Sequence, residues 1–255
     1  MITEKLTQLH SNEEAIRTES LNRVHASSDL SDHIAMIQSC LDLIYDLLPS
    51  NIIKSEDQLM LGNLGIRIFN AVNATLKLLL SGYYQAAALH LRDVLETTFL
   101  LDYFSIDAEL ITQWRTLPER VRIKRFRPVL IRNALDKRDG FADKKRAEAY
   151  NLLCKLAGHA SPEGVVMLIS VPGESNVHCG PFLEGTALCA VLSELAKLAV
   201  QAALSFAQVI AGNDIFQDQV HVSFIKAYKR WIERFFPLIP FAHPSGGKGK
   251  PLLAI

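Results

Sequence analysis

Apolar residues recur at intervals of three and four positions along most of this chain, a pattern typical of helices with one buried face. The longest such stretch runs from Leu78 to Phe104 and predicts the helix around which the rest of the chain is arranged. Its expected core positions are Ala86, Ala87, Leu91, Val94, Leu95, Phe99 and Leu101. Arg92 and Glu96 interrupt this apolar wall, and their spacing places them on the same face of the helix.

Similar periodicity predicts further helices over residues 31–48, 55–79, 107–117, 142–157, 183–211 and 215–236. Ser31 or Asp32 can cap the first of these and Ser55 the second. Pro128 is expected in the first turn of another helix, where proline is tolerated, and Gly158 as a left-handed C-cap after residue 157. The expected buried stripe of the 183–211 helix is Leu188, Val191, Leu192, Leu195, Leu198, Ala199 and Ala202.

One stretch has a different pattern. Residues 165–171 are apolar and rich in β-branched side chains, and a Pro-Gly turn separates them from a second extended candidate at 176–182. The sequence therefore predicts an all-α fold, a single bundle of about six to eight helices with one small β-hairpin near 165–182.

The domain organisation follows from the same patterns. Residues 1–28 are polar and weakly periodic, which indicates an N-terminal arm or a frayed helix. Residues 29–236 are expected to form the helical domain. Residues 237–255 have the composition of a mobile C-terminal tail.

Composition excludes several classes of protein. No run of about 18 or more residues is both apolar and uncharged, and the longest candidate, Leu198 to Gly212, is too short to cross a bilayer. The polar N-terminus lacks a signal core, so a cytoplasmic location without membrane association is expected. The four cysteines show no disulfide spacing. Cys154, His159, His178 and Cys179 have the wrong spacing for zinc, and neither a metal nor a cofactor is expected.

Charge is balanced overall, with 27 basic and 27 acidic residues, but unevenly distributed. Residues 115–146 contain 12 Lys or Arg and four acids, a local excess of eight positive charges. Such a segment can bind phosphate or an acidic partner, or it can be an ordinary solvated surface. The nucleic-acid candidates are Arg120, Arg122, Lys124, Arg125, Arg127 and Arg132, with Trp114, Phe126 and Phe141 as neighbouring aromatic residues.

Two polar features are candidates for a ligand or catalytic site. A buried Arg92 could bind a phosphate or carboxylate with Glu96 as orienter or base, or the two could simply neutralise each other inside the bundle. Tyr103, seven residues after Glu96, could extend the same column. His159 follows a helix end, where it could act as a base or phosphate ligand, or as a capping histidine.

The stretch Gly82-Tyr83-Tyr84, Ala86-Ala87, Leu91-Arg92 and Leu95-Glu96 resembles a signature of several all-helical bacterial families, mostly known as domains of unknown function. They are distantly similar to the HEPN superfamily of nucleotide-binding proteins and ribonucleases. The segment from Gly158 to Gly164 is similar to a His-containing loop that follows in these families. The resemblance implies a helical bundle and a role connected with RNA or cellular defence.

The chain departs from that superfamily at one important point. HEPN ribonucleases carry an Arg, then four to six intervening residues, then a His, all on one helix. Arg132 begins such a motif here, but Lys137, Arg138 and Asp139 stand where the histidine would be.

Three functions therefore stay open. The first is a non-catalytic binding module for RNA, a nucleotide or an acidic protein, with Arg92, Glu96, Tyr103 and His159 at its polar site. The second is a metal-independent ribonuclease of a toxin or phage-defence system that uses His159 and Arg92. The third is a helical scaffold without a ligand. Alanine-rich surfaces at 86–88 and 196–203 also suggest a homodimer.

Overall fold

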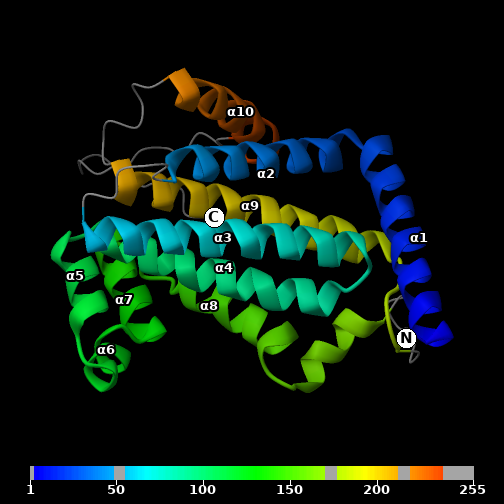
Figure 1. Ribbon diagram of the computed structural model, residues 1–255, viewed down its shortest axis with the longest axis horizontal. Coiled ribbons are helices and arrows are strands. Elements are labelled where there is room, and N and C mark those ends of the chain that lie inside the picture. The colour runs from blue at the N-terminus through cyan, green and yellow to red at the C-terminus, as the bar shows by residue number, and fades with distance from the viewer. Residues whose placement is uncertain (1–2, 49–54, 170–176, 212–218, 238–255) are drawn as a thin grey trace.

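The computed structural model describes residues 3–48, 55–169, 177–211 and 219–237. Within these ranges the chain is a helical bundle without a β-strand, which confirms the all-α prediction (Figure 1). The α-helices are α1 (Glu4–Ala26), α2 (Ser28–Leu47), α3 (Glu56–Leu80), α4 (Tyr84–Phe104), α5 (Glu109–Thr116), α6 (Glu119–Arg125), α7 (Pro128–Asp139), α8 (Lys145–Leu153), α9 (Gly185–Ala211) and α10 (Gln219–Phe235).

Helix α9 is the central helix, because it packs against α2, α3 and α4 (Figure 1). Every residue of the stripe expected for residues 183–211 is buried, since apolar residues at helical spacing turn one face to three neighbours. Helix α9 includes Glu194 and Lys197 and so is not free of charge, but by length and composition alone it is long and apolar enough to cross a membrane. More than half of its most apolar part is buried inside the bundle, as is usual for the core helix of a soluble protein.

Helix α4 follows its predicted pattern with one exception. Ala87, Leu91 and the later core positions are buried, but Ala86 is exposed. The alanine surfaces that suggested a homodimer are used inside the chain, where α4 packs against α9. The alanines buried in this way are Ala87, Ala88, Ala196, Ala199, Ala202 and Ala203.

Several helix boundaries have local causes that the sequence indicated. The Ser55 hydroxyl accepts a hydrogen bond from the Gln58 amide, 3.2 Å away, and Pro128 is in the first turn of α7. For α2 the cap is Ser27 and not Ser31 or Asp32, because α2 begins three residues earlier than expected. Residues 4–26, predicted as an arm or frayed helix, form α1.

Two parts of the fold prediction are wrong. Residues 162–168 form a 3-10 helix, η2 (Pro162–Leu168), where the first strand of a hairpin was expected. Pro162 favours a helical start and the Ser161 hydroxyl caps it by accepting from the Gly164 amide, and these local signals outweigh β-branched composition. Only an isolated bridge between Ile169 and Val177 remains, and residues 170–176 lie outside the described ranges.

The helix count was also too low. Ten α-helices, the 3-10 helix η2 and a π-helical segment, η1 (Cys154–Gly158), occur in the described part of the chain. The additional elements are α1, α6, η1 and η2, and within the basic segment Pro118 and Pro128 separate α5, α6 and α7. Proline lacks the amide hydrogen that would continue a helix. The predicted tail, apart from Pro237, lies outside the described ranges.

Helix α10 docks on α2 through a buried histidine. The Trp231 indole N–H donates to His33 Nδ1 at 3.0 Å, and the Phe235 ring stacks on the imidazole at 4.2 Å. Burial lowers the pKa of His33 below its ordinary value of 6.5, with Lys197 and Arg234 acting in the same direction against Asp29 and Asp32. His33 is therefore neutral when α10 is docked.

Acidification should weaken this docking. The unfolded chain takes up a proton at His33 near pH 6.5, whereas the folded chain resists it. The contribution of His33 to stability is thus complete above pH 6.5 and is lost as the pH falls from there toward the lower folded pKa. Urea unfolding at pH 7.5 and pH 5.5 should show a larger loss for the wild-type chain than for His33→Gln, which keeps an acceptor for Trp231 but cannot titrate. Equal losses would contradict this role of His33.

Candidate functional site

Arg92 is the centre of a polar cluster that joins α4 to α8 and η1. Its Nη2 donates to Glu96 Oε1 at 3.1 Å and to the Tyr150 hydroxyl at 2.7 Å, and its Nε donates to Cys154 Sγ at 3.2 Å. Burial by itself would lower the pKa of Arg92, but these bonds and the Glu96 charge raise it. Arg92 is therefore a permanent cation. The side chains of Arg92 and Glu96 are 25% and 28% exposed, so water or a ligand can reach both.

A second arginine contacts the Tyr150 ring of this cluster. The Arg132 guanidinium of α7 lies 4.1 Å from the centre of the Tyr150 ring, a cation–π contact. Arg132 is only 7% exposed, and its Nε and Nη1 have no hydrogen-bond partner in the described part of the chain. It was predicted to belong to a nucleic-acid-binding surface, but its burial removes it from that surface.

The two segments that carry the family resemblance pack against each other. A Cβ atom on Gly158 would lie 3.1 Å from Arg92 Cδ, so glycine allows η1 to approach α4 closely. Gly158 is not a left-handed C-cap, as was predicted, because its φ angle is not positive. Two turns of α4 earlier, the Gln85 side chain donates to the Gly164 carbonyl at 3.2 Å. The close approach of η1 to α4, and not the end of a helix, therefore explains the glycine at position 158.

His159 is near Arg92 in the chain fold but does not join its hydrogen bonds. The His159 amide donates to the Cys154 carbonyl at 3.0 Å, and the residue is exposed. It lines an open cleft of about 570 Å³ together with Gln85, Gly158 and Ser161. Tyr103, expected to extend the Arg92 column, instead makes an edge contact with Phe126 at a centroid distance of 6.1 Å. The structure thus brings together Arg92 and Glu96, with His159 on an adjacent cleft and Tyr103 apart from both.

Sequence reasoning missed the partners of Arg92. Tyr150 and Cys154 are 58 and 62 residues away in the chain, and no local spacing rule connects them to α4. Their separation of four residues places both on one face of the α8–η1 segment, which is the only signal that could have paired them.

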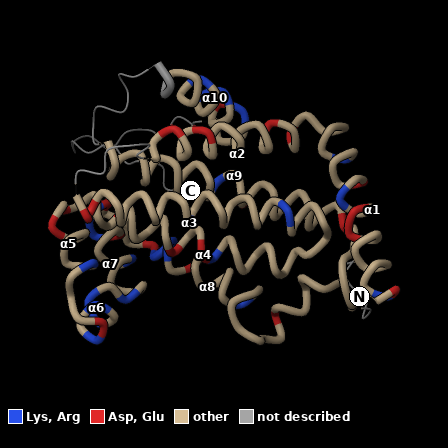
Figure 2. Tube along the Cα trace, viewed as in Figure 1, with Lys and Arg blue, Asp and Glu red and all other residues tan. Residues whose placement is uncertain are grey.

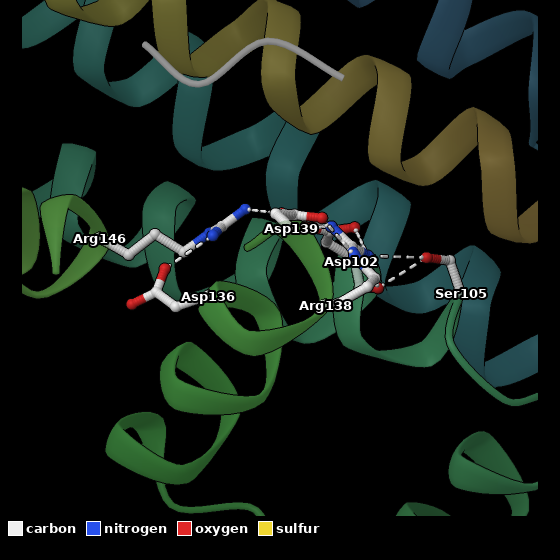
Figure 3. Close-up of polar contacts among 6 residues, drawn as sticks. All are labelled: Asp102, Ser105, Asp136, Arg138, Asp139 and Arg146. Atoms are coloured by element: carbon white, nitrogen blue, oxygen red, sulfur yellow. Dashed lines mark hydrogen bonds and ion pairs between the residues drawn. The ribbon is translucent and has the colours of Figure 1, made fainter. Parts of the chain in front are cut away.

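A separate ionic chain ties the basic segment to α4. Arg138 bonds Asp102 at 2.7 Å and Asp139 at 2.7 Å, and Arg146 bonds both Asp139 and Asp136 (Figure 3). Burial would raise the pKa of Asp139, but the hydrogen bonds from the two arginines lower it. Asp139 therefore stays charged, and the ion pairs with aspartates neutralise the charges of Arg138 and Arg146 within the chain.

The arginines around α6 have no such partners. Eight arginines form ion pairs with carboxylates, and these are Arg17, Arg23, Arg67, Arg92, Arg115, Arg138, Arg146 and Arg234. Five of the remaining six fall between residues 120 and 132, where Figure 2 shows Lys and Arg positions along α6. None of these five has an ion pair in the described ranges. The sixth is Arg230 of α10. Unneutralised arginine is thus concentrated in one short part of the chain.

These side chains are also accessible. No residue of α6 is buried, and Arg120, Lys124, Arg125 and Arg127 are exposed while Arg122 is half-buried. The aromatic residues behave differently: Phe126 is buried, as favoured, and Trp114 packs edge-on against Phe104 with the Arg122 guanidinium 6.0 Å from its ring. Only Trp114 is both partly exposed and close to these cations.

No cluster of three His, Cys, Asp or Glu side chains with metal-binding geometry is found among the described residues. Comparison with known proteins gives no matching family model, no similar curated protein and no similar solved structure.

Proposed function

We propose that this chain is a non-catalytic helical binding module for single-stranded RNA, and that α6 with the residue preceding α7 is its binding surface. The observation that carries the proposal is the concentration of unpaired, exposed arginine there. An arginine without a carboxylate partner can exchange water and counterions for phosphate with little desolvation of existing ion pairs.

The residue types favour phosphate. Four of the five exposed or half-buried cations, Arg120, Arg122, Arg125 and Arg127, are arginines and only Lys124 is a lysine. The planar guanidinium fork matches two phosphate oxygens, whereas an ammonium acts as a point charge. Trp114 beside Arg122 supplies one ring on which an unstacked base can lie. Since Trp114 is the one ring in a cation contact with these arginines among the described residues, binding should depend mainly on the phosphate backbone and little on sequence.

Charge removal on α6 should abolish most of this binding. Replacement of Arg120, Lys124 and Arg125 by Gln is expected to lower the affinity for a labelled oligouridine of about 12 nucleotides at least about tenfold. Fluorescence anisotropy at low salt measures this affinity. The matched control replaces Lys226, Lys229 and Arg230 of α10 by Gln, since these are equally exposed, carry the same charge and have no ion pair in the described ranges. Equal weakening of RNA binding by both triple variants would contradict a specific binding surface on α6. Displacement of the RNA by polyglutamate at equal charge would indicate that the partner of this surface is an acidic protein.

A ribonuclease is the alternative from a different class. Its support is the position of His159, on an open cleft and directly after the glycine that packs against Arg92. Incubation of the same oligonucleotide with the protein separates the two functions, because cleavage that is lost in His159→Ala would identify an enzyme. An intact oligonucleotide after prolonged incubation is the result that the binding module requires.

A further inference from the structure

A cavity of about 280 Å³ lies between α4, α9 and the segment that joins α7 to α8. It contains no residue of α6 and shares no residue with the cleft beside His159. Its size is slightly below the range of roughly 300–1,000 Å³ that is usual for small-molecule sites. A ligand for this cavity is therefore small.

The floor of the cavity is apolar. Leu95 and Phe99 of α4 and Leu198 of α9 are nearly inaccessible from outside, and Phe141 and Leu204 add further apolar surface. An apolar group placed here would be removed from water on several sides, which is the main source of affinity for a small ligand.

One wall carries a row of polar groups, two of which have no hydrogen-bond partner among the described residues. Lys197, Gln201 and Ser205 follow one another at intervals of four along α9 and all line the cavity. The side chains of Gln201 and Ser205 make no hydrogen bond with any described residue. Donors that line a cavity and lack partners are suited to the polar end of a bound molecule.

The charges around the cavity favour an anion. Arg138 and Arg146 are bound to aspartates (Figure 3), and Lys197 pairs with Glu194 at 2.6 Å. Lys145 lines the same cavity and has no ion pair in the described part of the chain. Asp136 and Asp139, just outside the lining, also pair with these arginines, so the described charges balance and Lys145 is the one cation of the lining without an ion pair among the described residues.

We infer that this cavity binds a small amphipathic monocarboxylate, with its apolar body against Leu95, Phe99 and Leu198 and its carboxylate toward Lys145 and the donors Gln201 and Ser205. This site is independent of RNA binding. Octanoate has the required combination of an unbranched apolar body and one carboxylate. The neutral and cationic analogues of the same length, 1-octanol and octylammonium, test the body and the charge separately.

Calorimetry on the full chain should show saturable octanoate binding, tighter than that of octylammonium by at least about tenfold. Ala149→Phe places a ring at the exposed rim of the cavity. Because the ring fills part of the cavity, the affinity for octanoate should fall at least about tenfold. Lys145→Gln should weaken octanoate by only about threefold, because an exposed charge contributes little, and should leave octanol unchanged. Lys137→Gln, an exposed lysine outside the cavity, is the matched control.

Gln201→Leu is a second variant, which keeps the size of the side chain and removes its hydrogen-bond donor. It should lower the affinity for octanoate more than the affinity for octanol. Three results would overturn the proposal: no saturable octanoate binding by the wild-type chain, unchanged affinity in Ala149→Phe with its fold intact by circular dichroism, or octylammonium binding as tightly as octanoate.

Discussion

Gly82→Ala is expected to destabilise the folded chain by about 3 kcal/mol or more, whereas Gly140→Ala should cost only about 1 kcal/mol. Both glycines have left-handed backbone angles, with φ of 82° and 72°. An alanine at either position therefore meets the same backbone strain, of roughly 1–2 kcal/mol. The two positions differ in the space available to a Cβ atom.

At Gly82 the added carbon would lie 2.4 Å from the Phe182 carbonyl oxygen and 2.8 Å from its amide nitrogen, whereas at Gly140 no atom lies within 4 Å. Backbone atoms cannot rotate away as the end of a side chain can, so the turn between α3 and α4 would have to separate from the segment that enters α9. The hydrogen bond from the Phe182 amide to the Gly82 carbonyl, 3.3 Å, would be lost with it. Urea unfolding of the two variants measures the difference, and equal losses would show that the close contact is not important for stability.

Phe206→Ala should lower the free energy of unfolding by about 3–5 kcal/mol, the usual effect of removing a buried aromatic ring. Phe206 of α9 has no exposed surface, and its ring lies directly over Gly65 of α3. The same contact predicts that Gly65→Ala destabilises by about 1–3 kcal/mol, because a Cβ there would come within 2.5 Å of the ring.

The contact between these two residues can be tested as a cycle. Phe206→Leu shortens the side chain at the site where Gly65→Ala adds an atom, so the double variant should be more stable than the sum of the single effects by about 1 kcal/mol. Urea unfolding of the wild type, both single variants and the double variant supplies the comparison. Strict additivity would mean that α3 and α9 do not meet at this glycine.

Much of the fold could be predicted because its cause is local. The buried stripe of α9 follows from apolar residues at helical spacing, and Ser55 and Pro128 begin helices through their own side-chain chemistry. Residues 4–26 were harder to assign, because only Ser20 and Val24 of α1 are buried and a helix with so little buried surface has almost no apolar pattern.

The errors come from properties that a single segment does not contain. Val165 and Val166 suggested a strand, but they are exposed in η2, so their β-branched side chains do not pack in a sheet. Ala86 fits the α4 stripe by spacing and is nevertheless exposed. Burial at the ends of an amphipathic helix depends on neighbours that the periodicity does not specify.

In the polar sites too, local spacing predicts some contacts, whereas others depend on how the helices pack. The approach of Arg92 to Glu96 follows from a spacing of four residues, but its bonds to Tyr150 and Cys154 depend on how η1 packs on α4. Arg132 looked like a surface residue within a basic run, and its burial over Tyr150 depends on the packing of α7 against α8. The unpaired state of the α6 arginines likewise required knowledge of where every carboxylate lies.

The salt dependence of RNA binding tests the proposed function of α6 most directly. For a single strand, the logarithm of the binding constant falls against the logarithm of salt concentration with a slope of about −0.7 per phosphate neutralised. The wild-type chain should show a slope of about −3, and the α6 triple variant a slope smaller in magnitude by about 2, while the α10 control keeps the wild-type slope. The same slope for all three proteins, or wild-type binding that does not change with salt, would contradict a phosphate-binding surface on α6.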